Sequence, residues 1–576
     1  MFGLEGKDGR LPVPAHLRLI AFMTDTSPAP STSPEADARL LSLYIRALVW
    51  YLVLVGAFAL FGIESIYRNP TPFHALVYPA GETWSGPLFI MGIIGVGVFA
   101  FVRFTAPPGT IAPHRVALFA GASFLWVMAL VAVLSREDGL AAGNASLWAV
   151  LWEGSRWQIP ALVVAFTFAM FGHRWYREHP ILDDAHGIPC LRSVLTALIA
   201  FSILFSAAVA MVRGGMNGVS DAYERETYEY IGDIGLRTTI RIFLRDYNSL
   251  HEYLSMHSKV HPPGPVVILW LISKVTFTRS PLVLSWGTIV LGSTAIIPLF
   301  LWVRDLFGAR QALLSAILYS LVPSIVLFTA TSADILFMPL TLWTLFLFWR
   351  AIHRNSWKYA LGAGALYAVM SLCSFSLLSV GAFFGLVGLW RLGQPGMRLS
   401  VIRTAALMIA SFLAVHLAVY YWSGFDVIEC FRLAKAQFDE DQANLDIYTP
   451  RYPAWVFRFL NPMTLFFFAG IPVSVLFCLR ILHPRQETPS QEESGVPSRQ
   501  LFIVFALTLF VLNLLYLGRG EGERSAMYIL PFVVIPAAHL LHEHCVRAGS
   551  IRPAVVVFVF LAIQSWAIES CLYTYW

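Results

Sequence analysis

Long apolar runs recur along almost the whole chain, and they constrain its fold more than any other feature of the sequence. Hydropathy indicates about fifteen such runs, roughly four before residue 190 and roughly eleven after it. A helix needs about 20 apolar residues to cross a bilayer, and most of the runs come close to this length. Hydrophobic residues make up 57% of the sequence and charged residues only 13%, too little charge for the surface of a soluble protein of this size. The sequence therefore predicts an all-α polytopic membrane protein.

The charged residues lie mostly in short basic loops between the apolar runs. The basic residues behind the net charge of +5 therefore set the orientation of the chain in the membrane, and no nucleic-acid partner is expected. Six cysteines are scattered without a C-x-x-C pair, so the sequence indicates neither a zinc site nor a disulfide framework. We expect an integral protein of a plasma or inner membrane.

Three regions can be separated along the chain. Residues 1–42 are polar, include "TSPAPSTSPEA" and predict a disordered cytoplasmic tail. Residues 43–190 predict an extra N-terminal membrane module of about four helices, in which we find no residues with evident chemistry. Residues 191–576 hold the remaining runs and a long charged segment, 213–281, which predicts a loop outside the cytoplasm.

One apolar stretch, residues 264–278, is too short to cross the membrane. About 15 residues at about 1.5 Å each span roughly 22 Å, against a hydrocarbon core of about 30 Å. If this stretch does not cross, the basic loops 302–311, 349–358 and 391–403 all face the cytoplasm together with the N-terminus, as the positive-inside rule requires. We therefore predict a juxtamembrane helix on the external face, with "HPP" (His261–Pro263) at its start. A short span in a thin bilayer is the alternative.

Three charged residues on the predicted external side are candidates for chemistry. Asp221 follows a predicted membrane exit and a run of glycines, which permits a sharp turn close to the membrane surface. Asp334 lies between two apolar runs, where a charge costs about 2.5–3.5 kcal/mol on insertion scales and so marks a functional candidate. A helix N-cap made by Ser332 or Asp334 is the alternative. Arg524 could bind a lipid phosphate through its planar guanidinium, or anchor a helix end by pairing with a glutamate.

The order of these motifs resembles a known family. The external loop opens with "DAYE" (Asp221–Glu224), "HPPG" (His261–Gly264) precedes the short apolar helix, and "ERSAMYILP" (Glu523–Pro531) lies near the C-terminus. This arrangement resembles the GT-C superfamily of membrane glycosyltransferases, in the branch of protein O-mannosyltransferases and aminoarabinose lipid A transferases. The resemblance covers about residues 193–542. It implies a GT-C-like helical bundle with external juxtamembrane helices for residues 191–576.

The resemblance also implies a function. Members of this family take a sugar from a polyprenyl-phosphate-linked donor, at a site on the extracytoplasmic face. We therefore expect a hexosyl- or pentosyltransferase that transfers the sugar to an acceptor hydroxyl with inversion of the anomeric centre. The acceptor, whether a glycan, a lipid or a protein, stays open, as does the sugar.

Roles for particular residues follow from the same resemblance. Asp221 takes the position of the catalytic base, and Arg524 and Tyr528 take the place of the region that faces the donor phosphate. Other residues are expected to line the donor and acceptor site: Tyr223, Glu224, His261, Pro262, Pro263 and Asp334. The family often has a second acidic residue directly after the base, where this chain has Ala222. That departure puts metal binding in doubt, so no metal ligand is predicted, no cofactor is certain, and a divalent cation is left open.

A membrane transporter or flippase for a lipid-linked or anionic solute is the alternative function, because it also needs many spans and charges within the membrane. Such proteins commonly contain inverted repeats and broken helices near the middle of the bilayer. We find no internal repeat in the sequence, and its unusual polar residues gather at one predicted face. We therefore prefer the glycosyltransferase.

Overall fold

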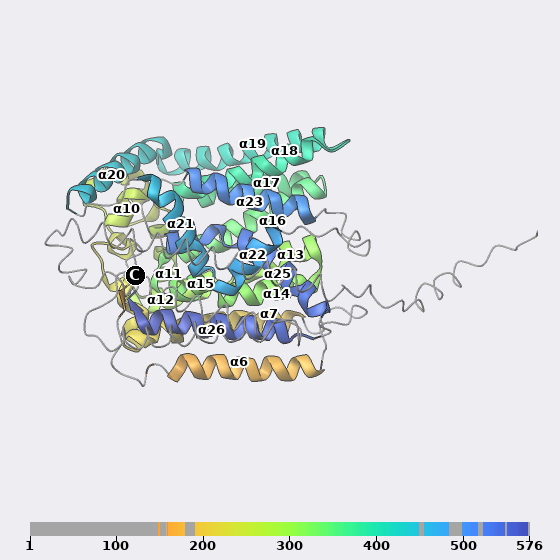
Figure 1. Ribbon diagram of the computed structural model, residues 1–576. Helices are drawn as coiled ribbons and strands as arrows, with labels where there is room; N and C mark the ends of the chain where they lie inside the picture. The colour runs from red at the N-terminus through yellow and green to blue at the C-terminus, as the bar shows by residue number, and fades with distance from the viewer. Residues whose placement is uncertain are drawn as a thin grey trace, which may run out of the picture.

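The computed structural model of the protein describes residues 148–149, 157, 159–178, 191–448, 454–482, 498–515, 522–547 and 550–573. These residues are almost entirely helical, and most of the helices lie side by side in one bundle (Figure 1). The exception is an antiparallel pair of two-residue strands, β1 (Trp148–Ala149) and β2 (Leu572–Tyr573). The predicted all-α class is confirmed for this part of the chain. The predicted tail, 1–42, lies outside it, as does most of the predicted module 43–190.

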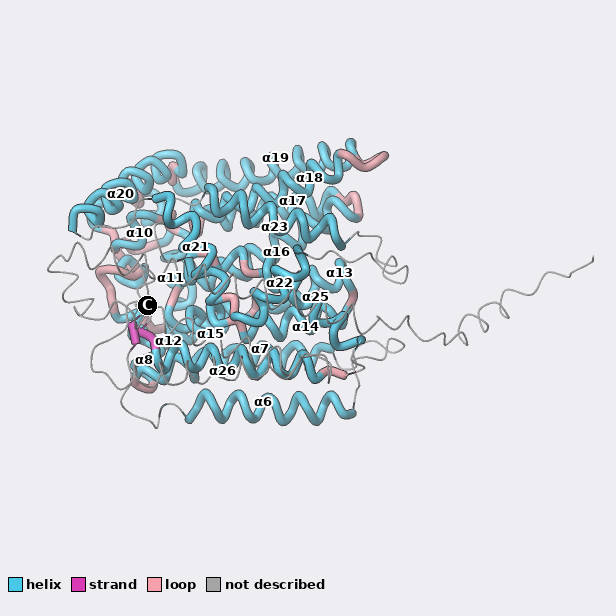
Figure 2. Tube along the Cα trace, in the orientation of Figure 1, coloured by secondary structure: helices cyan, strands magenta, loops and turns pink. Residues whose placement is uncertain are grey.

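The bundle consists of apolar helices that run in a similar direction (Figure 2). Their bounds are α6 (Ile159–Glu178), α7 (Leu191–Ala210), α12 (Pro281–Ser293), α13 (Ile296–Phe307), α14 (Ala309–Leu321), α15 (Pro323–Thr331), α16 (Phe337–His353), α17 (Trp357–Ser371), α18 (Gly381–Leu392), α19 (Arg398–Ser423), α21 (Ala454–Phe468), α22 (Ile471–Leu482), α23 (Ser498–Leu515), α25 (Pro531–Arg547) and α26 (Arg552–Cys571). This arrangement places the chain among integral membrane proteins.

Within the described residues, seven helical stretches are long and apolar enough to cross a membrane, or eight if the bent pair α14 and α15 is one span. The sequence predicted more spans. Three of them lie outside the described residues, and several others are short helices, such as α17 with 15 residues and α22 with 12. The helices α14 and α15 meet at 55°. Pro323 causes this break, since proline lacks an N–H and forces the preceding Val322 out of the helical conformation, to ψ 126°.

Aromatic side chains fill the middle of the bundle. Trp302 of α13 lies edge-on to Phe383 of α18 and Phe532 of α25, with ring centroids 5.9 and 6.3 Å apart. Phe505 of α23 joins them, with its ring centroid 5.2 Å from that of Phe532. All four side chains are fully buried. Such pairs contribute about 0.5–1.5 kcal/mol each beyond the area they bury, so this cluster ties together four helices from distant parts of the chain.

Residues 211–263, which we call the cap, cover one end of the bundle and are coloured yellow in Figure 1. The cap is built from short helices: η3 (Met211–Arg213), α8 (Met216–Glu224), η4 (Tyr230–Asp233), α9 (Ile240–Asp246), η5 (His251–Tyr253) and α10 (Met256–Val260). The polar helix α20 (Val427–Tyr448) lies at the same end, where Asn248 Nδ2 donates to the carbonyl of Asp426 at 2.8 Å. The loops after α16 and α18 lie at the opposite end (Figure 2).

The helix α11 (Gly264–Thr276) follows the cap directly. Its 13 residues make it about 20 Å long, which confirms the prediction of an apolar helix too short for a bilayer. Gly264 fixes where it begins: its N–H donates to the carbonyl of Leu372 at 2.8 Å, and a Cβ at this position would lie 2.3 Å from the same oxygen. The N-terminal end of α11 is thus held against the loop between α17 and η7 (Phe375–Val380). That α11 lies along the membrane surface stays a prediction.

Candidate active site

A buried ion pair lies where the cap meets the bundle. Arg524 belongs to α24 (Gly522–Ser525) and Asp334 to η6 (Ala333–Leu336), and Arg524 Nε lies 3.4 Å from Asp334 Oδ2. The side chains are only 9% and 14% exposed. Removing two charges from water is costly, so a pair of this kind is weak evidence for stability and a better indication of a functional site. The structure thereby brings together two residues that the sequence placed in the site.

Two serine hydroxyls hold the segments that carry this pair. Ser332 accepts a hydrogen bond from the backbone N–H of Asp334 at 3.2 Å, so the N-cap that the sequence left open is Ser332. The Asp334 carboxylate is therefore free of a capping role and reaches Arg524. Ser324 donates to the carbonyl of Glu523 at 2.5 Å and ties the start of α15 to α24. The Ser324–Glu523 bond thus fixes the two segments, far apart in the sequence, beside each other.

Side chains of the cap surround the ion pair. The charges of Asp334 and Arg524 are close enough to shift the pKa of both Tyr230 and His261, and the charge of Asp334 shifts the pKa of Tyr223. The Tyr230 ring lies edge-on to the His261 ring, with centroids 6.0 Å apart. The Nδ1 atom of His261 is buried and has no hydrogen-bond partner within the described residues. A polar atom of this kind facing a charged, buried site is suited to receive a ligand group.

Burial controls the protonation of these side chains. It raises the pKa of the Tyr223 and Tyr230 hydroxyls well above their ordinary value of 10, and the negative charges of Asp334 and Glu229 raise both further. Burial lowers the pKa of His261 from 6.5 to about 4; Asp334 opposes this fall, while neighbouring positive charges add to it. Both tyrosines and His261 are therefore neutral at pH 7, and each can donate a hydrogen bond without carrying charge.

The lowered pKa of His261 predicts a loss of stability in mild acid. The unfolded chain binds a proton at this residue below pH 6.5, whereas the folded protein resists it until about pH 4, so stability falls as the pH falls through this interval. We expect the free energy of unfolding to be about 2 kcal/mol lower at pH 5 than at neutral pH because of His261. The measurement is the unfolding temperature of the detergent-solubilised protein at pH 7 and pH 5. His261→Gln should show a smaller fall than the wild type, and an identical fall would contradict the assignment.

Asp221, the predicted catalytic base, lies on the solvent side of α8. Its side chain is 52% exposed and pairs with Arg225 at 2.6 Å, not with Arg524. Tyr223, two residues further on, is buried on the opposite side of the helix. Ser285 of α12 donates to the carbonyl of Val219 at 2.7 Å and clamps the inner side of α8 to the bundle. The catalytic role of Asp221 stays a prediction.

The remaining predicted site residues have varied surroundings. The Glu224 carboxylate accepts a hydrogen bond from Ser220 at 2.6 Å. The Tyr528 hydroxyl, buried on η9 (Met527–Ile529), shares a hydrogen bond of 2.9 Å with Ser379, so it joins η9 to η7. Pro262 and Pro263 are buried beside His261 at the start of α11. None of these contacts tests the predicted roles.

Sequence reasoning missed a second polar pair beside this site. Glu229 Oε2 lies 3.3 Å from Nδ1 of His257, and both side chains are largely buried. The Tyr230 ring lies 5.7 Å from that of His257, so it stands between the two histidines of the cap. In the sequence, Glu229 is one of many charges in a segment that resembles a solvated loop. Only its burial in the folded cap distinguishes it from the other charged residues there.

Among the residues that the structure describes, no group of three or more histidine, cysteine, aspartate and glutamate side chains could hold a metal ion. The described residues therefore offer no set of ligands for the divalent cation whose presence the sequence left undecided. The chemistry that the candidate site itself offers consists of carboxylates, buried hydroxyls, a neutral imidazole and the guanidinium of Arg524.

A bundle of apolar helices with a buried charged site beneath a polar cap defines an integral membrane protein with a candidate site at one end of its bundle. Residues 260–422 match the profile of a family described as dolichyl-phosphate-mannose-protein mannosyltransferase. The match begins at the HPPG motif and ends in α19, so it includes neither Asp221 nor Arg524. It confirms the predicted resemblance to GT-C membrane glycosyltransferases. Comparison with curated protein sequences gives no match.

Solved structures with some likeness include an oligosaccharyltransferase from Archaeoglobus fulgidus. Its crystal structure in complex with Zn and sulfate is 14% identical, with a TM-score of 0.38, and the match covers 64% of this chain and 53% of that one. The oligosaccharyltransferase AglB from the same organism, in complex with an inhibitory peptide and a dolichol-phosphate, is 14% identical with a TM-score of 0.35, covering 69% and 56%. This chain thus spans about half the length of these proteins. TM-scores this low do not establish a common fold.

Proposed function

We propose that this protein transfers a sugar from a polyprenyl-phosphate-linked donor to an acceptor hydroxyl, at the extracytoplasmic face of the membrane. The observation that supports this most directly is the buried Arg524–Asp334 pair between the cap and the apolar bundle. A guanidinium in this position can receive a lipid phosphate whose chain remains in the bilayer. The similarity of residues 260–422 to a mannosyltransferase family supports the same class of donor.

Arg524 acts on the leaving group in this proposal. When the bond between the anomeric carbon and the phosphate oxygen breaks, the phosphate keeps the electron pair and its negative charge grows. A guanidinium already held in place by Asp334 stabilises that charge without having to reorganise. The arriving phosphate competes with Asp334 for Arg524, so the ion pair serves to position the guanidinium before the donor binds.

Asp221 acts on the acceptor. It accepts the proton of the acceptor hydroxyl while that oxygen bonds to the anomeric carbon, from the side opposite the phosphate, so the centre is inverted. Its half-exposed position on α8 suits an acceptor that arrives from water. The ion pair with Arg225 is also exposed and contributes little to stability, so it can open readily.

Neutral groups of the cap bind the sugar between these two charges. Tyr223, Tyr230 and His261 are uncharged at pH 7 and carry N–H or O–H donors. Such donors suit the hydroxyl groups of a sugar, and their rings offer apolar faces to its C–H groups.

The test uses purified protein in lipid nanodiscs and a panel of radiolabelled polyprenyl-phosphate hexoses and pentoses. We expect at least one donor to be hydrolysed slowly, and more rapidly transferred once its acceptor is supplied, with release of polyprenyl phosphate. The same preparation in liposomes is assayed for movement of a fluorescent lipid-linked sugar between leaflets. Movement without any turnover of a donor would contradict the proposal and favour the transporter that the sequence left as the alternative.

A further inference from the structure

A cationic pocket lies at the end of α11 that is far from the candidate active site. It has a volume of about 320 Å³ and is lined by Gly235, Leu236, Arg237, Thr238, Trp270, Lys274 and Arg279. At about 1.5 Å per residue, Lys274 lies roughly 15 Å along α11 from Gly264, the end that meets His261. The pocket is therefore separate from the Arg524–Asp334 pair.

Two of its cations have no acidic partner among the described residues. Neither Lys274 nor Arg279 forms an ion pair with an acidic side chain in the part of the chain that the structure describes. Arg279 Nη1 donates to the carbonyl of Ile234 at 3.2 Å, which fixes the guanidinium against the loop. Gly235 makes room for it, with φ at +81° and a position where any Cβ would lie 2.4 Å from Arg279 Nη2. The backbone at Ile234 and Gly235 thus accommodates the Arg279 guanidinium without neutralising its charge.

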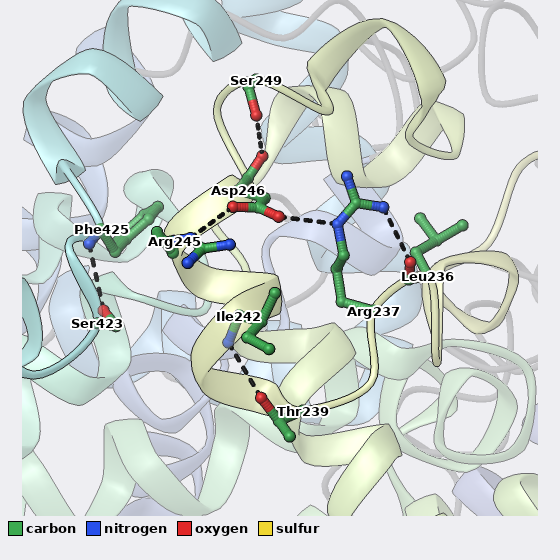
Figure 3. A network of polar contacts seen from close by, with 9 residues as sticks. All are labelled: Leu236, Arg237, Thr239, Ile242, Arg245, Asp246, Ser249, Ser423 and Phe425. Carbon is green, nitrogen blue, oxygen red and sulfur yellow. Dashed lines mark hydrogen bonds and ion pairs between the residues drawn. The ribbon is translucent and has the colours of Figure 1, made fainter.

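Arg237 adds a third cation, whose Nε and Nη1 atoms already have partners. Figure 3 shows its guanidinium held between Asp246 and Leu236: Nε lies 2.8 Å from Asp246 Oδ2, and Nη1 donates to the Leu236 carbonyl at 3.0 Å. Asp246 also pairs with Arg245 at 2.8 Å, so its single charge is shared between two arginines. The pocket therefore keeps an excess of positive charge.

Trp270 lines the same pocket. Its side chain is 98% buried, and its indole N–H has no hydrogen-bond partner among the described residues. Its ring packs edge-on against Phe243, which holds it in place. A pocket lined by an aromatic ring and by cations that lack an acidic partner among the described residues indicates a ligand with negatively charged oxygen atoms.

The surface next to the pocket is apolar and exposed. Leu271, Val275 and Phe277 project from α11 and its C-terminal end, and Phe277 is 95% exposed. Phe277 also has a left-handed backbone at φ +57°, a conformation that residues other than glycine rarely adopt. Arg279 comes just before Pro281, where a candidate membrane span begins. The cations and the apolar side chains therefore lie together at the edge of the membrane-spanning bundle.

We propose that this pocket binds the phosphate of an anionic membrane phospholipid, with the acyl chains against Leu271, Val275 and Phe277. Lysine and arginine near a membrane surface attract anionic lipids, and arginine binds phosphate oxygens through two parallel hydrogen bonds. The exposed apolar side chains favour a lipid over a soluble phosphate, since a soluble ion would leave them in water. Such a lipid holds the C-terminal end of α11 at the membrane surface.

Native mass spectrometry of the full chain in detergent tests this proposal, with phosphatidylglycerol as the probe and phosphatidylcholine of the same acyl chains as the uncharged comparison. We expect the wild type to prefer phosphatidylglycerol, and the variant Lys274→Gln/Arg279→Gln to bind it about tenfold more weakly. Lys358→Gln removes an exposed cation from the start of α17, at the other end of the bundle, and should leave binding unchanged. The measurement concerns binding alone, so its outcome is independent of the proposed sugar transfer.

Two results would overturn the assignment. Equal affinity of the wild type and the double variant for phosphatidylglycerol would show that the pocket does not hold the lipid. Competition by inorganic phosphate at equal concentration would identify a soluble anion as the ligand instead. If the double variant unfolds, as its melting temperature would show, the exposed single substitution Lys274→Glu takes its place, with Lys358→Glu as the control.

Discussion

Replacing Arg524 by glutamine is expected to lower the rate of sugar transfer by about 10²–10³-fold, the loss typical of removing a group that stabilises charge in the transition state. The donor phosphate would lose the guanidinium that receives its growing charge, while the acceptor side of the site keeps all its groups. We therefore expect a fall in kcat and a weaker response to donor concentration, with an unchanged response to acceptor concentration. The measurement is steady-state transfer in nanodiscs with each substrate varied in turn.

The same substitution leaves the Asp334 carboxylate buried without its partner, and breaking a buried pair typically costs about 3–5 kcal/mol. Loss of activity could then reflect unfolding alone. The double variant Arg524→Gln/Asp334→Asn removes both charges, so we expect it to recover most of the unfolding temperature and none of the transfer. Recovery of transfer in the double variant would show that the pair is structural and would exclude Arg524 from phosphate binding.

Arg391 provides a matched control for this experiment. It is buried to the same degree as Arg524, but it lies at the end of α18, over the ring of Trp390, with Nη1 donating to Gln394. Arg391→Gln should therefore lower stability without changing the dependence of the rate on donor concentration.

The fold could be predicted to the extent that it depends on the local polarity of the chain. The apolar helix after the HPPG motif was expected at residues 264–278 and occurs at Gly264–Thr276, because prolines begin it and a charged, polar turn ends it. The continuous spans expected in the later part were predicted less well. Hydropathy averages over a window, so it does not register the break that Pro323 introduces between α14 and α15.

The candidate site could be predicted only in part, because its contacts join distant segments. Asp334 and Arg524 each stood out as a charge at the end of an apolar run, and the structure places them 3.4 Å apart. The Glu229–His257 pair gave no such signal, since both residues lie among many charges of the cap. Asp221 illustrates the opposite case: its position in the sequence is distinctive, yet its only ion pair in the described part of the chain is with Arg225, one helical turn away.

Replacing Asp221 by asparagine is expected to lower transfer by about 10²–10⁴-fold, the usual contribution of a general base. Because the side chain is half-exposed and paired only at the surface, we expect the unfolding temperature to stay close to that of the wild type. The apparent affinity for the donor should also be retained, since the phosphate is bound elsewhere. Glu226→Gln, at an exposed carboxylate of the same segment, is the control and should transfer at the normal rate.

Near-normal transfer by Asp221→Asn would remove this residue from the mechanism and direct attention to Asp334. In the resting structure Asp334 is a poor candidate for a base, because its carboxylate is committed to Arg524. A donor phosphate that competes for Arg524 would release it at the moment when a base is needed. Asp334→Asn, compared with Asp221→Asn over a range of donor concentrations, separates the two possibilities. A positioning role for Asp334 raises the donor concentration needed for half-maximal rate, whereas a role as base lowers the maximal rate itself.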